Sequence, residues 1–396
     1  MKYSSILWST VIALVAYAPS VSAVPKPALS GTHSARAKHI PWSGSWWPMA
    51  SGELVLGWDD GAGRRAWSRA DVKAFDQCIS SYTAACTKLL SKMAGKDGKA
   101  LSPMMKFDFA FRQLNERIYG PGEAPSSAYS HAAKWDLENH TIGDNSRHRH
   151  WEAREFAGKC IGWALSTFDY PEPTKSKTIE GVVFRPADIK GILAALYNGA
   201  QFFVPEDAVV GNAFYESTGT AADYKDVLPL AFLRALSLTI DRGLLLEADL
   251  EPGSEVWNYP IFKYDLKWKQ TRPGVVGGEV TIFYADDDVH FDAVFSTNSR
   301  RPDIQSRKLP FELKVPAKWD GDLRSAKEGR WIGTAIDEHP DALILWLEKD
   351  WRRAIYQYRE SQMKLEVNFQ LLKRINVQGR GWVPVVDMIL DQYYRS

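Results

Sequence analysis

Cys160 stands in the stretch FAGKCIGWALSTF, with Gly158 two residues before it, Gly162 two residues after it, and then Trp163. The residues that follow favour a helix, so the pattern predicts that Cys160 lies at or near a helix N-terminus. The partial positive charge of a helix start favours a thiolate, the form in which cysteine acts as a nucleophile. We expect Gly162 to leave space for a substrate and Trp163 to wall the site. A small buried core residue is the alternative, and the commoner role of a free cysteine.

The chain has three cysteines, Cys78, Cys86 and Cys160, so at least one thiol is unpaired. Cys78 and Cys86 lie in a segment with helical spacing of apolar residues. Eight residues along one continuous helix separate two Cα atoms by about 12 Å, which is too far for a disulfide. The pair therefore forms a disulfide only if the helix breaks between them, and Cys160 is left over in either case.

The N-terminal segment has the pattern of a secretory signal peptide over residues 1–23. Lys2 precedes an apolar run from Ile6 to Ala18, and small residues follow at positions 21–23. The run is shorter than the roughly 20 residues that span a bilayer. Residues 24–40 are rich in Pro, Ser, Lys and His and are interpreted as a flexible arm or a remnant of a pro-segment. We expect a secreted, extracellular protein without a membrane partner.

Charge argues against nucleic acid as a partner. Lys plus Arg number 49 and Asp plus Glu 48, so the formal charge of +1 gives no field that would attract a polyanion. The 16 Trp residues provide large side chains for a core and for the walls of a concave site.

The order of hydrophobic patterns predicts an α+β fold. Residues 41–150 read as a mostly helical N-terminal region, and 151–350 as a region that starts with helices and continues with strands from about residue 256. Residues 351–396 return to a helical tail. Helices followed by strands, with no βαβ alternation, are typical of α+β proteins.

Several motifs together resemble the secreted transglutaminase elicitors of oomycetes and their bacterial relatives, over roughly residues 40–350. The most specific is VWNYPIFKYDLKW, residues 256–268, which is similar to the surface segment that plants recognise in that family. The others, in chain order, are IPWSGSWWPM, GKCIGWA, EGVVFRPADIKGIL and GRWIGTAIDEHPDALILW.

The resemblance implies a papain-like cysteine core with calcium-dependent transglutaminase activity. In that chemistry the Cys160 thiolate attacks a glutamine carboxamide, ammonia leaves, and a lysine amine resolves the thioester. The partners would be proteins with accessible Gln and Lys, and host immune recognition of residues 256–268 is a further implied interaction. Trp163 and Trp257 would wall the acceptor tunnel. A cysteine peptidase shares the first half of the reaction and lets water complete it.

The histidine that would act as base is predicted from the same comparison. His290 and His339 are the histidines downstream of Cys160. His339 lies in DEHPD, which is similar to the family's His-Pro-Asp motif, and is the preferred candidate. His290 lies in the acidic stretch YADDDVHFD, whose simpler interpretation is a solvated turn.

Leu233 marks a departure from the family. Relatives carry a Phe-His pair where this chain has Phe232 and Leu233, which favours an inactive relative that acts as a secreted binding or elicitor protein. The acidic member of the site is expected to be Asp249, with Asn258 as an orienting alternative and substrate-binding residue.

Metal ligands are not identified by the sequence. Asp286, Asp287 and Asp288 have oxygen donors suited to calcium, but no EF-hand spacing accompanies them and such a run is commonly solvated. A group of histidines before Cys160 has spacings of nine, eight and two, which match no standard zinc motif. These histidines are His131, His140, His148 and His150.

Overall fold

The structure of the protein is a computed structural model. It describes residues 30–49, 51–58, 67–95, 100–125, 128–139, 158–198, 208–211, 227–251, 255–296, 300–347, 370–377 and 381–395. The predicted signal peptide lies outside the described residues. Within these ranges, no helix has the length and apolar character needed to cross a membrane.

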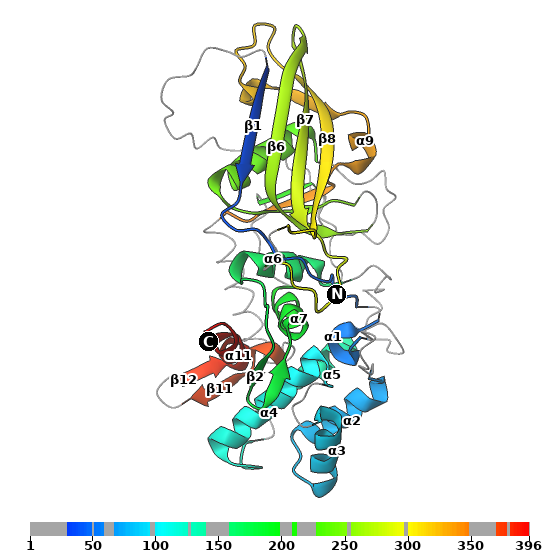
Figure 1. The fold of residues 1–396 in the computed structure, drawn as a ribbon, viewed down its shortest axis with the longest axis vertical. Helices are drawn as coiled ribbons and strands as arrows, with labels where there is room; N and C mark the ends of the chain where they lie inside the picture. Colours follow the sequence, from blue (N-terminus) through cyan, green and yellow to red (C-terminus); the bar gives the residue numbers. More distant parts are fainter. Residues whose placement is uncertain are drawn as a thin grey trace, which may run out of the picture.

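The molecule is elongated, with a curved antiparallel sheet at one end and helices at the other (Figure 1). The eight-stranded sheet has the order β4-β10-β5-β6-β7-β8-β9, and β1 pairs separately with β6. This separation of sheet and helices confirms the α+β prediction. The strands are β1 (Ser30–Arg36), β4 (Val209–Gly211), β5 (Leu246–Asp249), β6 (Asn258–Arg272), β7 (Val275–Ala285), β8 (Ile304–Lys314), β9 (Glu328–Trp331) and β10 (Ala342–Leu345).

The helical end contains α1 to α5, and α6 and α7 lie between it and the sheet (Figure 1). Two short β-hairpins flank the helices: β2 (Lys177–Ile179) with β3 (Val182–Phe184), and β11 (Arg374–Val377) with β12 (Gly381–Pro384). The helices are α1 (Glu53–Leu56), α2 (Arg69–Ile79), α3 (Ala84–Ala94), α4 (Pro103–Tyr119), α5 (Ala132–Asn139), α6 (Cys160–Asp169), α7 (Pro186–Tyr197), α8 (Pro229–Thr239), α9 (Ala335–Glu338) and α11 (Val385–Tyr394).

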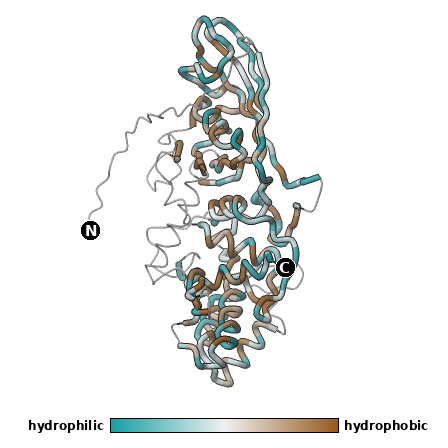
Figure 2. Tube along the Cα trace, turned by 90° about the vertical axis from the view of Figure 1, so that its left-hand side faces the viewer, coloured by the Kyte–Doolittle hydropathy of each residue, from teal (hydrophilic) through white to brown (hydrophobic). Residues whose placement is uncertain are grey.

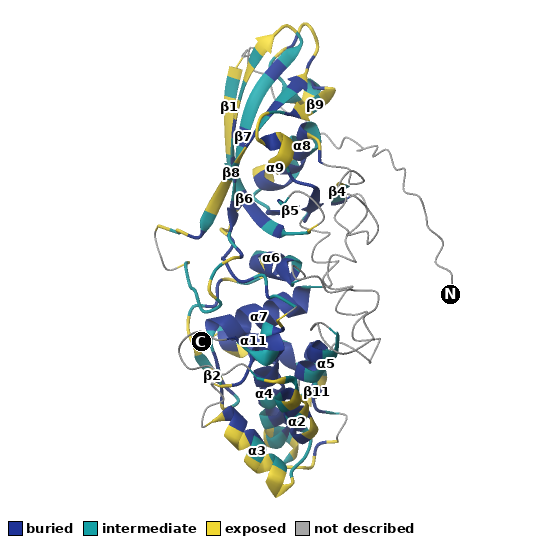
Figure 3. Cartoon of the chain, turned by 90° about the vertical axis from the view of Figure 1, so that its right-hand side faces the viewer, coloured by how far each residue is buried: buried dark blue, intermediate teal, exposed yellow. Residues whose placement is uncertain are grey.

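The short strands β5 and β10 separate two hydrophobic cores. Ile344 and Trp346 belong to the core that includes α6 and α7, whereas Leu343 and Leu345 belong to the core beneath α8. Successive residues of a strand point to opposite faces, so one short strand contributes to both cores. Figure 3 accordingly shows α8 on one side of β5 and α6 on the other, with α6 and α7 largely buried. In Figure 2 hydrophobic residues concentrate along the middle of the molecule.

The segment predicted as a flexible arm contains a strand. Residues 30–36 form β1, which pairs antiparallel with β6, for example Ala35 with Tyr264. β5 pairs only with the first part of β6, up to Ile261, so the edge beyond it offers unpaired backbone groups. β1 pairs with these groups from Lys263 onward. An uncovered strand edge is a site for unwanted pairing with other chains, and β1 covers this one. Residues 24–29 lie outside the described part.

The disulfide between Cys78 and Cys86 forms because the helix breaks, as the sequence required. α2 ends at Ile79 and α3 begins at Ala84, with Thr83 as its N-cap. The reversal brings the two cysteine Cα atoms to 4.9 Å. Cys160 is the free cysteine of the chain.

The C-terminal tail differs from the helical prediction for 351–396. Its described residues contain the β11–β12 hairpin, paired from Arg374 with Pro384 to Val377 with Gly381, before helix α11. The alternating buried Ile375 between exposed neighbours is a strand pattern that is too short to distinguish from a helix by periodicity.

Gly162 is required by packing and does not provide space for a substrate. A Cβ atom at this position would lie 1.9 Å from the carbonyl oxygen of Ala194 on α7. The absence of a side chain therefore allows α6 and α7 to approach each other backbone to backbone, which corrects the expectation of an open space beside Cys160.

We predict that Gly162→Ala lowers the free energy of unfolding by about 3 kcal/mol, because the added methyl group must displace backbone in a filled core. Gly181→Ala is the comparison: Gly181 has φ +72°, and a Cβ added there would meet no atom within 4 Å. Gly181→Ala should lower the free energy of unfolding by only about 1–2 kcal/mol, because alanine is disfavoured in the left-handed backbone conformation. Urea denaturation measures both; equal losses would contradict the close helix contact.

Candidate active site

Cys160 is the first residue of α6, with Lys159 as the N-cap. This confirms the predicted helix start. The backbone N–H of Lys159 donates to the carbonyl of Trp46 at 2.7 Å. Gly158 passes so close to Trp46 that a Cβ there would lie 2.4 Å from the indole ring. The position of the helix start is therefore set by a segment more than a hundred residues earlier in the chain.

That segment, residues 41–47, is here called the strap. Its Gly44 N–H donates to the carbonyl of Asp286 at 3.1 Å, and its Trp46 N–H donates to the carbonyl of Asp287 at 3.2 Å. The strap thus forms hydrogen bonds with the loop after β7 on one side and with the start of α6 on the other. It brings the acidic loop and Cys160 into the same region.

The thiol of Cys160 faces the beginning of β6. Its Sγ lies 3.8 Å from the carbonyl oxygen of Val256, and the side-chain amide of Asn258 donates to Sγ at 3.9 Å. Asn258 is the first residue of β6 and is buried. The sequence-predicted Cys160 and Asn258 are therefore brought together.

Asp249 supports this arrangement from the neighbouring strand. It pairs with Asn258 across β5 and β6, and its Oδ1 accepts from the backbone N–H of Trp257 at 2.9 Å. Burial raises the pKa of Asp249 to about 8, partly opposed by that hydrogen bond. Asp249 thus holds the backbone that presents Val256 and Asn258 to the thiol.

Two further carboxylates lie near the thiol, and the sequence did not identify either as a site residue. Glu247 and Asp287 are 0 % and 2 % exposed, and each has one buried carboxylate oxygen without a hydrogen-bond partner. Burial raises their pKa values to about 8 and about 7 respectively. Asp287 was expected in a solvated turn; its burial follows from the strap that covers the loop. Glu247 could have been identified from the sequence, because it lies two residues before Asp249 and therefore on the same face of the strand.

The thiol of Cys160 is neutral at physiological pH. Burial raises its pKa to about 12, hydrogen bonds from Asn258 lower it, and the negative charges of Asp287 and Glu247 raise it further. Desolvation thus outweighs the favourable position at the helix start, which corrects the expectation of a resting thiolate. A substrate or a proton acceptor must promote ionisation.

His339 lies elsewhere in the fold. Its ring stacks on Trp331 of β9 with centroids 5.9 Å apart, and its Nδ1 lies 2.9 Å from the carbonyl oxygen of Ala335. The hydrogen-bond contacts of the Cys160 sulfur are instead with Val256 and Asn258, so the structure does not bring the predicted base and nucleophile together.

The other positions considered for the base are also accounted for. Leu233 is on α8 and packs against the core beneath that helix, not against Cys160. The Nδ1 of His290 accepts from the backbone N–H of Asp292 at 3.3 Å within its own turn. His131 pairs with Asp76, and His140, His148 and His150 lie outside the described residues.

The aromatic wall is formed by a different pair from the predicted one. Trp163 is fully buried in the core and does not line the site. Trp257 is half-buried and meets Trp46 edge to face, with ring centroids 5.0 Å apart. Trp46 was missed, although the strap sequence PWSGSWW is unusually rich in tryptophan. Trp46 lies against Gly158, two residues before Cys160, and Trp257 stands between Val256 and Asn258, which contact the thiol.

The segment 256–268, expected at the surface, lies mostly within β6. It runs between β7 on one edge and β5 and β1 on the other, and Lys267 is its exposed residue. Inner strands have both edges paired, which explains the burial of this segment.

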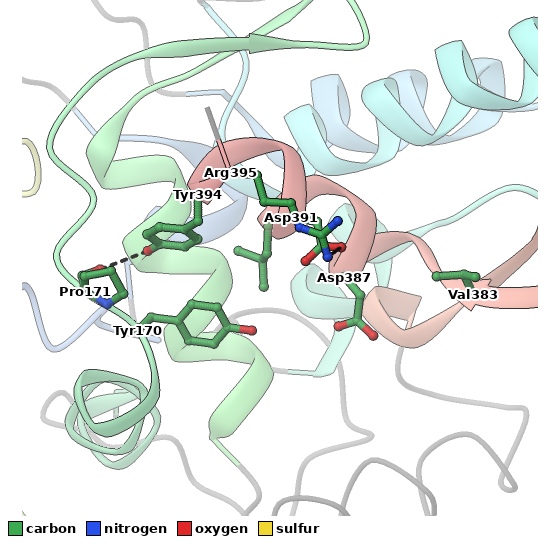
Figure 4. Close-up of a pocket in the computed structure, with 8 residues that line it drawn as sticks. Tyr170, Pro171, Val383, Asp387, Asp391, Tyr394 and Arg395 are labelled. Atoms are coloured by element: carbon green, nitrogen blue, oxygen red, sulfur yellow. Dashed lines mark hydrogen bonds and ion pairs between the residues drawn. The ribbon is translucent and has the colours of Figure 1, made fainter. Parts of the chain in front are cut away.

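A surface pocket of about 470 Å³ lies at the other end of α6 (Figure 4). Tyr170 caps that end of the helix, roughly 15 Å along the axis from Cys160 at 1.5 Å per residue. The pocket is therefore separate from the candidate active site. Its lining residues are Tyr170, Pro171, Val383, Asp387, Leu390, Asp391, Tyr394 and Arg395.

No known protein-family model matches the sequence, and no curated protein gives a significant match. Among solved structures, the chain is similar to the crystal structure of the GP42 transglutaminase from Phytophthora sojae. The TM-score is 0.45 and the identity 16 %, covering 82 % of this chain and 90 % of that chain. Because a likeness of this strength is too weak to assign a function, the residues around Cys160 must carry the proposal.

We predict that the protein loses stability as pH rises from about 5 to 9. A carboxyl group with a raised folded-state pKa stabilises the fold while protonated, and this contribution is lost as pH rises through the folded-state pKa, which is about 8 for Glu247. Glu247→Gln should reduce the loss by a few kcal/mol at most. Thermal denaturation across this pH range measures it. The exposed Glu328→Gln is the control, and an unchanged pH dependence in Glu247→Gln would contradict the prediction.

Proposed function

We propose that this chain is a secreted, cysteine-dependent transglutaminase with a papain-like core, which crosslinks glutamine and lysine side chains of proteins through a thioester on Cys160. The observation that carries the proposal is the placement of the free cysteine at the start of α6, beside the Asn258 amide at the start of β6. A thiol at a helix N-terminus facing a polar residue of a strand is an arrangement suited to nucleophilic catalysis.

The proposed reaction has two halves. The sulfur of Cys160 attacks the carbonyl carbon of a glutamine carboxamide, a C–S bond forms, and the C–N bond breaks to release ammonia. A lysine amine then attacks the thioester, forms an amide bond and returns the thiol. Water in place of the amine gives hydrolysis. The Trp46–Trp257 pair lies on the two segments that contact the N-cap of α6 and the thiol, and it would favour the amine by limiting water.

The backbone around Cys160 supports the charged intermediate of this reaction. The first N–H groups of α6 are the unpaired donors of a helix start, and the amide of Asn258 adds a side-chain donor on the facing strand. Donors fixed in advance stabilise the oxyanion that develops on the carboxamide oxygen. Asp249 acts as a positioning residue, because its carboxylate binds the Trp257 N–H next to Asn258.

Calcium dependence and immune recognition remain predictions from the resemblance. Within the described residues, no group of three or more His, Cys, Asp or Glu side chains is arranged to hold a metal ion. These residues do not fit a calcium site, so no step is assigned to calcium. Recognition of 256–268 by a host receptor would require release of this strand from the sheet.

A secreted binding protein without catalysis is the second candidate. The absence of His339 from the hydrogen-bond contacts of Cys160, together with the raised pKa of the thiol, favours it. A cysteine peptidase is the third, and it shares the nucleophile with the transglutaminase.

Incorporation of a fluorescent primary amine into a glutamine-rich protein separates these candidates. We expect incorporation by the wild type and complete loss in Cys160→Ala, which removes the nucleophile and little volume. The assay is run with and without calcium, and circular dichroism checks the fold. Substrate cleavage without incorporation would indicate a peptidase, and neither reaction would indicate a binding protein.

We predict that His339→Gln changes amine incorporation by less than about threefold, because the imidazole packs on Trp331 and has no hydrogen bond with the Cys160 sulfur. Removal of a general base lowers the rate by about 10² or more, so a catalytic His339 and a His339 that only packs on Trp331 give clearly different rates. Initial rates at saturating amine measure the effect. A hundredfold loss in a correctly folded variant would reinstate His339 as the base.

A further inference from the structure

We propose that Asp287 is the proton carrier of the active site: its carboxylate takes the proton of the Cys160 thiol and delivers it to the nitrogen of the departing carboxamide. The proposal rests on the proposed acyl transfer at Cys160 and names a catalytic residue for it. It replaces the imidazole that cysteine enzymes commonly use with a buried carboxyl group.

The strap fixes Asp287 beside the start of α6. The N–H of Trp46 donates to the carbonyl of Asp287, and the carbonyl of Trp46 accepts from the N–H of Lys159, the residue before Cys160. Two consecutive hydrogen bonds therefore connect the acidic loop with the nucleophile. On the other side, the interaction with Tyr259 lowers the pKa of Asp287, and Tyr259 follows Asn258, which contacts the thiol.

One oxygen of this carboxylate is available for a proton. Oδ2 of Asp287 is buried and has no hydrogen-bond donor. An unsatisfied carboxylate oxygen in a desolvated site costs free energy, so a proton or a substrate N–H is the partner that it lacks. Burial also raises the pKa of Asp287 to about 7, which suits a group that must both accept and donate a proton near neutral pH.

The other two carboxylates near the thiol accept hydrogen bonds from protein donors, although one oxygen of Glu247 is also without a partner. Asp249 binds the backbone of Trp257. Glu247 accepts from the indole N–H of Trp346 at 2.7 Å, within the layer of β5 and β10. The charges of Asp287 and Glu247 both raise the pKa of Cys160, and the contribution of Asp287 is the larger.

The proton balance of the first half-reaction is complete. The thiol proton moves to Oδ2 of Asp287 while the C–S bond forms, and the same proton moves to the carboxamide nitrogen while the C–N bond breaks. Ammonia leaves, and Asp287 is again a carboxylate. In the second half it accepts a proton from the attacking amine and returns it to the sulfur. In the resting protein the thiol contacts Val256 and Asn258, and catalytic hydrogen bonds commonly tighten only with substrate bound.

The test compares two substrates that differ in their need for a proton on the leaving group. A glutamine peptide loses its carboxamide nitrogen as ammonia, so this nitrogen must gain a proton as it leaves. In contrast, p-nitrophenyl acetate releases a phenolate that leaves without a proton. We expect Asp287→Asn to lower the rate of ammonia release by about 10² or more and the rate of Cys160 acylation by the ester by about tenfold or less, because both reactions need the thiol proton removed and only the first also needs it delivered to the leaving group. Asparagine keeps the shape of the side chain and removes its charge.

Glu247→Gln is the matched control, because it removes the same charge from a neighbouring buried carboxylate. It should keep both rates within about threefold. Iodoacetamide labelling of Cys160 at about pH 9, where both carboxyl groups are ionised, serves as a check on the thiol. It should be faster in both variants than in the wild type, because each variant loses a negative charge that raises the thiol pKa. The titratable groups that interact with the Asp287 carboxyl group are Cys160, Tyr259, Asp286 and Asp288.

Three outcomes would overturn the proposal. Equal losses on the peptide and the ester in Asp287→Asn would show that Asp287 does not deliver the proton to the leaving group, and a loss on the peptide in Glu247→Gln but not in Asp287→Asn would assign the proton transfer to Glu247. No ammonia release by the wild type, with the ester burst intact, would leave Asp287 without a reaction to serve. Ammonia release without amine incorporation would refute the transglutaminase alone, and the comparison of variants would still decide the role of Asp287.

Discussion

The hydrogen bonds of the strap are the constraint on which the candidate site depends. Residues 41–47 bond to the loop after β7 and to the N-cap of α6, so they join two segments that are more than a hundred residues apart in sequence. They add to the contacts of Cys160 with Val256 and Asn258, which join the start of α6 to the sheet directly. The small residues Gly44 and Gly158 make this possible, because a Cβ at either position would collide with a tryptophan ring.

Burial determines the chemistry of this region. The thiol of Cys160 and the carboxyl groups of Glu247, Asp249 and Asp287 all have raised pKa values, and in each case desolvation is the largest cause. Desolvation therefore keeps the proton on the thiol in the resting protein. It also explains why a helix start does not by itself create a thiolate: the partial charge of the helix acts on a group that has lost its water.

Local pattern was sufficient for several features of the site. The helix that begins at Cys160 and the close approach at Gly158 follow from residue types within a few positions. Which residues lie next to the Cys160 thiol could not be predicted from local pattern. His339 is separated from Cys160 because the ring stacks on Trp331 of β9, and no local pattern indicates which distant tryptophan a histidine will meet. Whether the predicted residues catalyse a reaction stays a prediction.

The sequence by itself determined the mixed α+β class, the unpaired status of Cys160 and the condition for the Cys78–Cys86 disulfide, because helix geometry and cysteine parity need only local spacing. Only the tertiary structure decided that Gly162 serves helix packing, that Trp46 stands where Trp163 was expected, and that Asp287 is buried. These properties depend on which segments cover one another. The local sequence of a turn does not show whether a distant segment covers it or leaves it in water.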